Sequence, residues 1–283
     1  MATDILLVHS GPLFPSHIND CITLLVKQNF RVHLIIEPEL NSFIKNTTIN
    51  IVNINDVSDS RYSHYDILNY DIKFREGFFL RTSSRFIIID NYAKLAGLTN
   101  FFHIENDIAV FSDLVNIQNY LEKSTYDISI VMDNYFRCVP SIIWYRDCLA
   151  TNKLANFIYY NNNIDDMKNL ARFFHKNRDS VTNFPIVPLD LIDQTYNINY
   201  GNMYKEIQSI FDGAAIGQYL YGIDTLGNSP TSNTIGFINE TCVFDVSKFD
   251  IELQNNRPVI HYNNTFIPIN NLHIHSKNFK NIL

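Results

Sequence analysis

Several features are scarce in this sequence of 283 residues, and each scarcity excludes a class of protein. The chain carries 22 Lys and Arg against 29 Asp and Glu, a net charge of −7, and has no dense basic cluster of the kind that binds nucleic acid. No stretch reaches the roughly 18 uninterrupted apolar residues of a membrane helix, and no basic segment precedes a long apolar run near the N-terminus. We therefore expect a soluble, cytoplasmic protein without a nucleic-acid partner or a membrane span.

Paired cysteines and domain linkers are also missing. The four cysteines lie far apart in the sequence, which excludes a compact zinc site or a disulfide framework and predicts reduced core thiols. No internal repeat, glycine-rich linker or block of charge divides the chain, and 46% hydrophobic residues can build a substantial core. We predict one domain over residues 1–283, with an Asn-rich and Tyr-rich insertion at about 145–205 that shapes a pocket.

The N-terminal part of the chain has the pattern of a βαβ unit. An apolar run over residues 4–8 stops at the polar loop that begins with His9 and Ser10, and helical spacing follows over residues 16–29. Residues 31–36 and 49–56 read as two further strands, the second ending at Asp56. This order predicts an α/β fold whose ligands bind at the carboxyl ends of the strands.

The central motif is Glu105-Asn106-Asp107, which interrupts an apolar run over residues 101–111. Two carboxylates behind a buried strand can chelate a divalent cation, since Mg²⁺ and Mn²⁺ favour carboxylates together with phosphate oxygens. Acids at strand ends also cap the next helix or turn, and the motif alone leaves both interpretations open. Asp107 is the stronger ligand candidate, with Glu105 acting directly or through water.

Arg81 and Arg85 precede this motif on an expected helix that ends at Gly97. A spacing of four residues places both guanidinium groups on one face, where they can bind a diphosphate or a sugar hydroxyl. Such pairs also occur on the solvent face of a helix, and the sequence does not decide between the two.

Asp212 opens a segment of small residues with helical spacing, Phe211-Asp212-Gly213-Ala214-Ala215. It can support the helix dipole or act as a catalytic carboxylate, and we predict the catalytic role. Asp133, at the end of an expected strand over residues 126–133, is the reserve candidate.

His273 and His275 lie close to the C-terminal end of the sequence. In an extended segment they point to one face, where imidazole is a normal ligand for Mn²⁺ or Zn²⁺, although polar residues on a surface strand have the same pattern. Lys277 can supply a point charge to a phosphate. Short strands are also expected over residues 242–245 and 259–262.

The order of these motifs resembles a known family. The helix with Arg81 and Arg85, then FFHIENDIAVF, FDGAAIGQYLYG and LHIHSK, is similar to the metal-dependent glycosyltransferases of the GT-A fold, especially the small ones of large DNA viruses and bacteria. The resemblance implies a single nucleotide-binding domain with a central mixed, mostly parallel sheet flanked by helices. It also implies a nucleotide-diphosphate sugar donor, most simply a UDP-sugar, and transfer to a hydroxyl of a glycan or other acceptor.

The same resemblance implies a role for each motif. Mn²⁺ or Mg²⁺ would be held by Asp107, His273 and His275, and Asp212 would activate the acceptor. The residues in contact with the nucleotide sugar would be His9, Ser10, Asp56, Arg81, Arg85, Glu105, Asn106 and Lys277. The family motif usually begins with Asp, and Glu105 stands in that position here.

Two other functions fit the same residues. A catalytically silent protein that binds a nucleotide or sugar would keep the fold and the polar residues. A nucleotidyltransferase would share the sheet, but the Gly-rich loop with Arg and Lys that such enzymes carry is missing between His9 and His17.

Overall fold

The computed structural model describes residues 2–65, 73–74, 77–223, 235–279 and 282. Its strands are β1 Asp4–His9, β2 Arg31–Ile36, β3 Asn50–Asn53, β4 Phe101–Ile104, β5 Ile108–Val110, β6 Ile128–Asn134, β7 Arg137–Tyr145, β8 Val181–Asn183, β9 Ile192–Asp193, β10 Ile198–Asn199, β11 Asp250–Gln254, β12 Arg257–Tyr262, β13 Thr265–Pro268 and β14 Asn271–His273. Its α-helices are α1 His17–Lys27, α2 Ser60–Ser63, α3 Phe78–Ala96, α4 Val115–Lys123, α5 Cys148–Tyr160, α6 Asp166–Lys176, α7 Tyr204–Ile207 and α8 Ile216–Tyr221, and its 3-10 helices are η1 Pro38–Phe43, η2 Ile54–Val57 and η5 Val246–Lys248.

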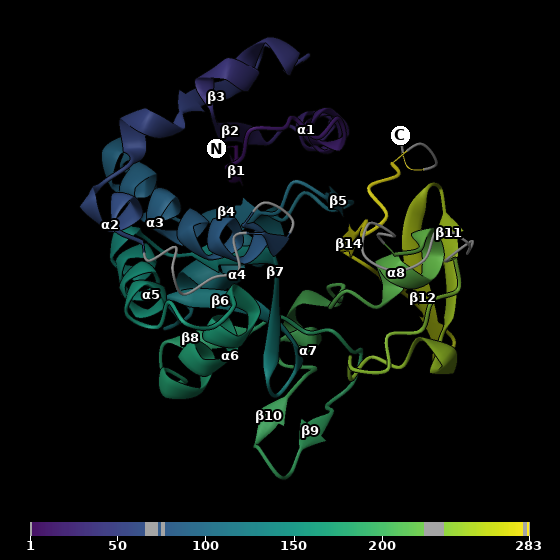
Figure 1. The fold of residues 1–283 in the computed structure, drawn as a ribbon. Coiled ribbons are helices and arrows are strands. Elements are labelled where there is room, and N and C mark those ends of the chain that lie inside the picture. Colours follow the sequence, from purple (N-terminus) through teal and green to yellow (C-terminus); the bar gives the residue numbers. More distant parts are fainter. Residues whose placement is uncertain (1, 66–72, 75–76, 224–234, 280–281, 283) are drawn as a thin grey trace.

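A seven-stranded sheet in the order β3-β2-β1-β4-β7-β6-β8 forms the centre of the molecule. The strands β3, β2, β1 and β4 are parallel neighbours, as are β6 and β8, and only β7 within this sheet pairs antiparallel with its two neighbours. Helices α3, α5 and α6 pack against one another beside the sheet, and α1 packs against β2 and β5 (Figure 1). The predicted α/β class with a mixed, mostly parallel sheet and flanking helices is confirmed.

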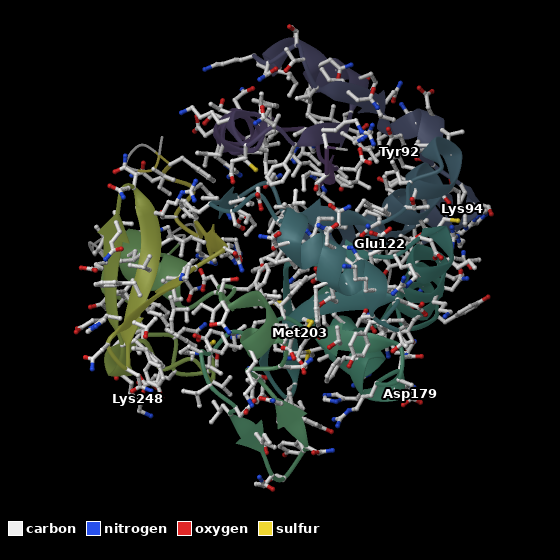
Figure 2. The ribbon with its side chains drawn as sticks, turned by 180° about the vertical axis from the view of Figure 1, so that it is seen from behind. Tyr92, Lys94, Glu122, Asp179, Met203 and Lys248 are labelled. Atoms are coloured by element: carbon white, nitrogen blue, oxygen red, sulfur yellow. The ribbon has the colours of Figure 1, made fainter. Side chains whose placement is uncertain are left out.

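The apolar strands of this sheet are buried, as a sheet covered by helices requires. Every residue of β4 is buried, and so are Trp144 and Tyr145 at the end of β7. Charged side chains such as Lys94, Glu122, Asp179 and Lys248 are exposed at the surface (Figure 2). None of the described helices is both long enough and apolar enough to cross a membrane.

Three smaller sheets accompany the central one. Strands β11, β12 and β13 form an antiparallel sheet that lies, together with α8, on the opposite side of the molecule from α2, α3 and α5 (Figure 1). Strands β9 and β10 form a projecting hairpin, and β14 pairs with β5. This last pair brings the C-terminal segment next to the loop after β4.

The predicted strand over residues 242–245 is wrong, because the chain bends at residues 242–244 and has no regular structure at residue 245. The expected strand over 49–56 is shorter, since β3 ends at Asn53 and Asp56 lies in the 3-10 helix η2. Within the range 145–205, α5, α6 and β8 belong to the main layers, while the β9–β10 hairpin projects from them. The division of the chain into one domain with an insertion stays a prediction.

Helix α3 is buried along most of its length and carries a buried acid, Asp90, whose exposure is 0%. The Asp90 carboxylate accepts hydrogen bonds from Arg61 (2.6 Å), Lys94 (2.8 Å), Asn152 (3.0 Å) and Thr151 (3.1 Å). A buried carboxylate is tolerated only when such donors replace water. These contacts tie α2, α3 and α5 together.

Replacement of Asp90 by Ala leaves Arg61 without its buried partner and removes a contact shared by three helices. We expect the free energy of unfolding, measured with urea, to fall by about 3 kcal/mol or more. The matched control is Asp190→Ala, which removes an ion pair with Lys205 on the exposed surface and should leave the urea midpoint nearly unchanged. Equal effects of the two substitutions would contradict this role of Asp90.

Candidate functional site

The candidate site lies at the edge of the sheet where β1, β2, β4 and β6 have their carboxyl ends, which is where open α/β sheets bind ligands. Glu105, Asn106 and Asp107 form the short loop between β4 and β5. Because β5 pairs with β14, with Ile108 opposite His273, the loop faces the C-terminal segment. The Nε2 atom of His273 lies 3.1 Å from a carboxylate oxygen of Asp107.

Glu105, Asp107 and His273 each have a potential ligand atom within 4.8 Å of the others. Two carboxylates and an imidazole form a donor set that suits Mn²⁺ and, with fewer protein ligands, Mg²⁺. The Nδ1 atom of His273 is buried and has no hydrogen-bond partner among the described residues, so the ring has a nitrogen that no hydrogen bond occupies. These residues therefore fit a divalent cation.

The group of potential ligands differs from the expected set of Asp107, His273 and His275. Glu105, which was expected to act directly or through water, lies in the group with Asp107 and His273. His275 does not belong to it, although the two histidine rings are only 5.7 Å apart. The backbone explains this difference, because β14 ends at His273 and the chain turns immediately afterwards, so that the two side chains do not share one strand face.

Two basic side chains contact Asp107, which is only 6% exposed. The Lys277 ammonium donates a hydrogen bond to the same carboxylate oxygen that His273 approaches. Burial by itself would raise the pKa of Asp107, but Lys277 and His273 hold this pKa well below its ordinary value. Burial would likewise lower the pKa of His273, and the Asp107 carboxylate raises it instead. A cation that binds here would compete with Lys277 and with a proton on His273 for this carboxylate.

Arg85 is buried, and its guanidinium connects two carboxylates. It donates to Glu105 (2.7 Å) and to Asp166 (2.8 Å), the first residue of α6, and Asp166 also accepts from Thr82 (3.2 Å). The solvent-face interpretation of Arg85 is therefore wrong. Its contacts orient Glu105 through a charge-assisted bond. Sequence reasoning missed Asp166, because an acid that follows Asp165 at a helix start has the pattern of an ordinary cap.

A cavity of about 550 Å³ surrounds this group of residues. Its walls contain most of the predicted site residues: His9, Ser10, Arg81, Arg85, Glu105, Asn106, Asp107, His273, His275 and Lys277. The structure thus brings together residues from four separate stretches of sequence. We call this cavity the metal cleft.

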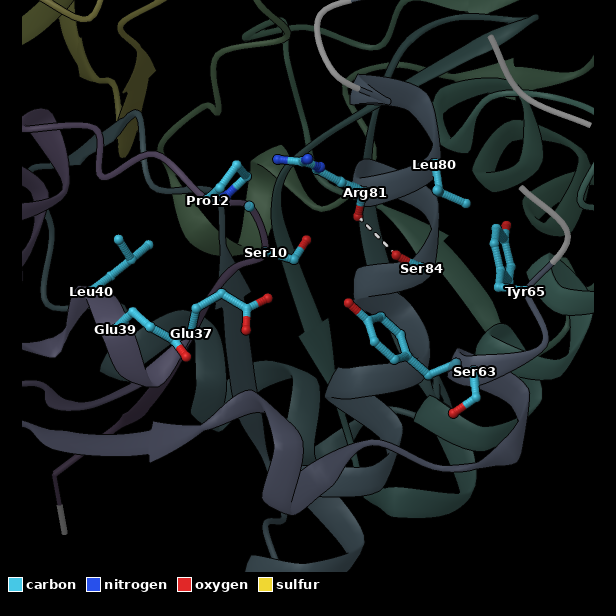
Figure 3. A pocket seen from close by; sticks show the side chains of 12 residues that line it. Ser10, Pro12, Glu37, Glu39, Leu40, Ser63, Tyr65, Leu80, Arg81 and Ser84 are labelled. Carbon is cyan, nitrogen blue, oxygen red and sulfur yellow. Dashed lines mark hydrogen bonds between the residues drawn. The ribbon is translucent and has the colours of Figure 1, made fainter. Parts of the chain in front are cut away.

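A second cavity, of about 710 Å³, adjoins the metal cleft and shares Ser10 and Arg81 with it. Figure 3 shows the carboxylate of Glu37, which follows β2, below Ser10, with Arg81 higher in the view. Tyr62 also lines this cavity. Gly11 permits the position of Arg81, since a Cβ there would lie 2.2 Å from the guanidinium. We call this cavity the side pocket. Sequence reasoning did not select Glu37 or Tyr62.

Two predicted site residues do not line either cavity. Asp56 is exposed in η2. Asp212 is completely buried, and its oxygens accept hydrogen bonds from the backbone N–H groups of Ala215, Ile216, Gly217 and His273, at 2.8 to 3.0 Å. These contacts are those of a residue that positions α8 against β14, and they leave no surface for an acceptor hydroxyl.

Asp133, the reserve candidate, is also buried. Arg137 donates to one of its carboxylate oxygens (2.6 Å), while the other oxygen has no partner among the described residues. Burial raises the pKa of Asp133 to about 6, against the lowering effect of Arg137. Asp133 does not line the metal cleft or the side pocket.

Comparisons with known proteins yield only partial likenesses. No protein-family model matches the chain, and no curated protein matches it. Among solved structures, the PaToxG glycosyltransferase has 8% identity and a TM-score of 0.41, covering 62% of this chain and 68% of its own. A cytidylyltransferase from Leptospira borgpetersenii has 8% identity and a TM-score of 0.41, covering 71% and 81%. A UTP-bound UGPase from Acinetobacter baumannii has 11% identity and a TM-score of 0.31, covering 61% and 82%. Likenesses at these scores say nothing of substrate.

The Asp212→Asn variant tests the positioning role. The amide oxygen of the new Asn can still accept hydrogen bonds. Its NH₂ group would face backbone donors such as the N–H of His273 and could not accept from them. We expect the dissociation constant for Mn²⁺, measured by calorimetry, to rise by about tenfold or more, as for other changes behind a metal ligand. Unchanged metal affinity with complete loss of turnover would instead support a catalytic role for Asp212.

The raised pKa of Asp133 makes a signed prediction for stability. Between its ordinary value of 3.8 and about 6, the folded protein binds more protons at this carboxyl than the unfolded chain does. Stability therefore falls as the pH rises through this interval, by on the order of 2 to 3 kcal/mol from this group. In urea unfolding from pH 4 to 7, the wild type should lose this much stability relative to Asp133→Asn. Parallel curves would contradict the prediction.

Proposed function

We propose that this protein is a glycosyltransferase of the GT-A type, which moves a sugar from a nucleotide-diphosphate donor, such as a UDP-sugar, to a hydroxyl acceptor with the help of Mn²⁺ or Mg²⁺. The observation that carries the proposal is the position of the Glu105, Asp107 and His273 group in a cleft that adjoins a second cavity. A nucleotide sugar has three parts of different chemistry, and these adjoining cavities offer a different surface for each.

The nucleoside would occupy the side pocket. Glu37 offers a carboxylate to donors such as ribose hydroxyls or base N–H groups, and Tyr62 offers a ring and a hydroxyl. Arg81 lines both cavities, so a diphosphate that passes between them would meet its planar guanidinium, which binds phosphate oxygens in a bidentate manner. The sugar would then point into the remainder of the metal cleft.

Release of the nucleoside diphosphate is the step that needs stabilisation, because negative charge develops on the leaving phosphate. A bound divalent cation would supply Lewis-acid stabilisation of that charge. Among the chain's own residues, Asp107, Glu105 and His273 would hold the cation, and Arg85 keeps Glu105 oriented. Lys277, once displaced from Asp107, would be placed to donate a hydrogen bond to a phosphate oxygen.

A catalytically silent nucleotide-binding or sugar-binding protein is the alternative, and one contact favours it. Lys277 and His273 neutralise Asp107 without any metal, so the cleft is electrostatically balanced as it stands. A silent protein would bind the nucleotide through Arg81 and Lys277 and would show no metal-dependent turnover.

The decisive experiment incubates the purified protein with UDP-sugars and GDP-sugars plus Mn²⁺ and measures release of the nucleoside diphosphate. Asp107→Ala should abolish release and weaken Mn²⁺ binding by more than the roughly 10-fold to 100-fold typical of changes behind the ligands. His275→Ala is the matched control, because His275 lies in the same cleft outside the ligand group, and its Mn²⁺ affinity should remain within about twofold of the wild type.

Two outcomes would count against the proposal. Nucleotide binding without release of product, in the wild type and in Asp107→Ala alike, would favour the silent alternative. Failure of every nucleotide to bind in the presence of Mn²⁺ would exclude the glycosyltransferase and a silent nucleotide-binding protein alike.

A further inference from the structure

The metal cleft has an aromatic end that the proposed chemistry does not use. Phe74, Phe78 and Phe79 line it, with ring centroids 5.3 to 6.5 Å apart. Phe74 is 43% exposed and Phe78 is 38% exposed, although buried sites are usual for such residues. We call these three residues the aromatic wall.

One face of α3 connects the aromatic wall to the ligand group. Phe78, Arg81, Thr82 and Arg85 follow the i, i+3, i+4, i+7 spacing of a single helix face, and all four line the cleft. At a rise of 1.5 Å per residue, Phe78 lies about 10 Å along the helix axis from Arg85, which contacts Glu105. Phe78 and Arg85 therefore lie about two helical turns apart in the same cleft.

Polar atoms border the aromatic wall. Thr82 lies one helical turn after Phe78, and its hydroxyl meets the Asp166 carboxylate at 3.2 Å. Asp166 lines the cleft but is only 3% exposed, and Thr82 donates to one of its oxygens while Arg85 donates to the other. Each carboxylate oxygen keeps a second lone pair, so Asp166 and Thr82 form a hydrogen-bonding edge beside the exposed rings.

We infer that this end of the metal cleft is a subsite for a pyranose ring, with the C–H face of the sugar against the aromatic wall and its hydroxyls toward Asp166 and Thr82. A pyranose presents both kinds of surface, whereas a lipid chain would leave the polar edge unsatisfied. The inference rests on the proposed function and adds the residues that select the substrate. The ring can belong to the donor or to the acceptor, since the chemistry of the two is the same.

The variant Phe78→Ala removes one ring of the wall, and Phe266→Ala is its control, because Phe266 is 50% exposed on β13 outside the cleft. Binding of UDP and of UDP-glucose in Mn²⁺ is measured by calorimetry, and transfer is measured over a range of acceptor concentrations. We expect Phe78→Ala to leave UDP binding unchanged. If the wall holds the donor sugar, Phe78→Ala should weaken UDP-glucose binding about tenfold. If the wall holds the acceptor sugar, Phe78→Ala should raise the acceptor KM about tenfold and leave donor binding unchanged.

The variant Phe78→Leu distinguishes a sugar at the wall from an apolar acceptor, because leucine keeps the apolar area but has no aromatic ring. It should behave like Phe78→Ala, and full recovery would overturn the inference. An equal loss of UDP and UDP-glucose binding in Phe78→Ala would mean that a base stacks on the wall, which also overturns it. Thermal unfolding of each variant should match the wild type, and a variant that fails this test is replaced by Phe79→Leu.

Saturation-transfer NMR with methyl glucoside, galactoside and mannoside tests the subsite independently of nucleotide binding. At least one glycoside should receive saturation on the protons of one ring face in the wild type and in Phe266→Ala, and less than half as much in Phe78→Ala. No transfer to any glycoside, or equal transfer in Phe78→Ala, overturns the subsite. Glycoside binding without nucleotide binding would instead overturn the proposed function alone.

Discussion

The pairing of β5 with β14 is the constraint on which the candidate site depends. These three-residue strands place His273 opposite Ile108 and so bring a C-terminal histidine and lysine to Asp107. The pairing is reinforced from behind by Asp212, whose carboxylate joins the start of α8 to the N–H of His273. Gly217 permits this close approach, since a Cβ there would lie 2.2 Å from the His273 carbonyl oxygen. The candidate cation site is therefore a product of tertiary packing around a short strand pair.

Charge balance is the second constraint on the cleft. Carboxylates with little access to water must be paired, and Arg85 contacts two of them, the partly buried Glu105 and the buried Asp166. Because Arg85 lies on the long, largely buried helix α3, this pairing fixes Glu105 relative to the central scaffold. The same helix face carries Arg81, which lines both cavities, and Phe78, which belongs to the aromatic wall. One helix thus relates the ligand group, the phosphate-binding candidate and the proposed sugar subsite in space.

Sequence patterns predicted the elements whose apolar residues are periodic and whose ends carry clear signals. The first two strands, α1 and α3 are present as expected, and α3 ends at Gly97, which adopts a left-handed conformation. The sequence did not identify strand β7. Pro140 interrupts its apolar run, and β7 pairs antiparallel with β4 and β6, which the expected βαβ order does not predict. The expected strand over 242–245 fails because a few apolar residues can equally fill a bend beside the core.

By itself, the sequence determined the α/β class, the position of Glu105 and Asp107 at a strand end, and the candidate status of Arg81, Arg85, His273 and Lys277. Residue type and local spacing are sufficient for that. Only the tertiary structure decided that Glu105, and not His275, joins Asp107 and His273, that Asp212 bonds backbone N–H groups, and that Asp166 faces the cleft. These assignments depend on which side chains meet across long separations in the chain, and local patterns carry no information about such contacts.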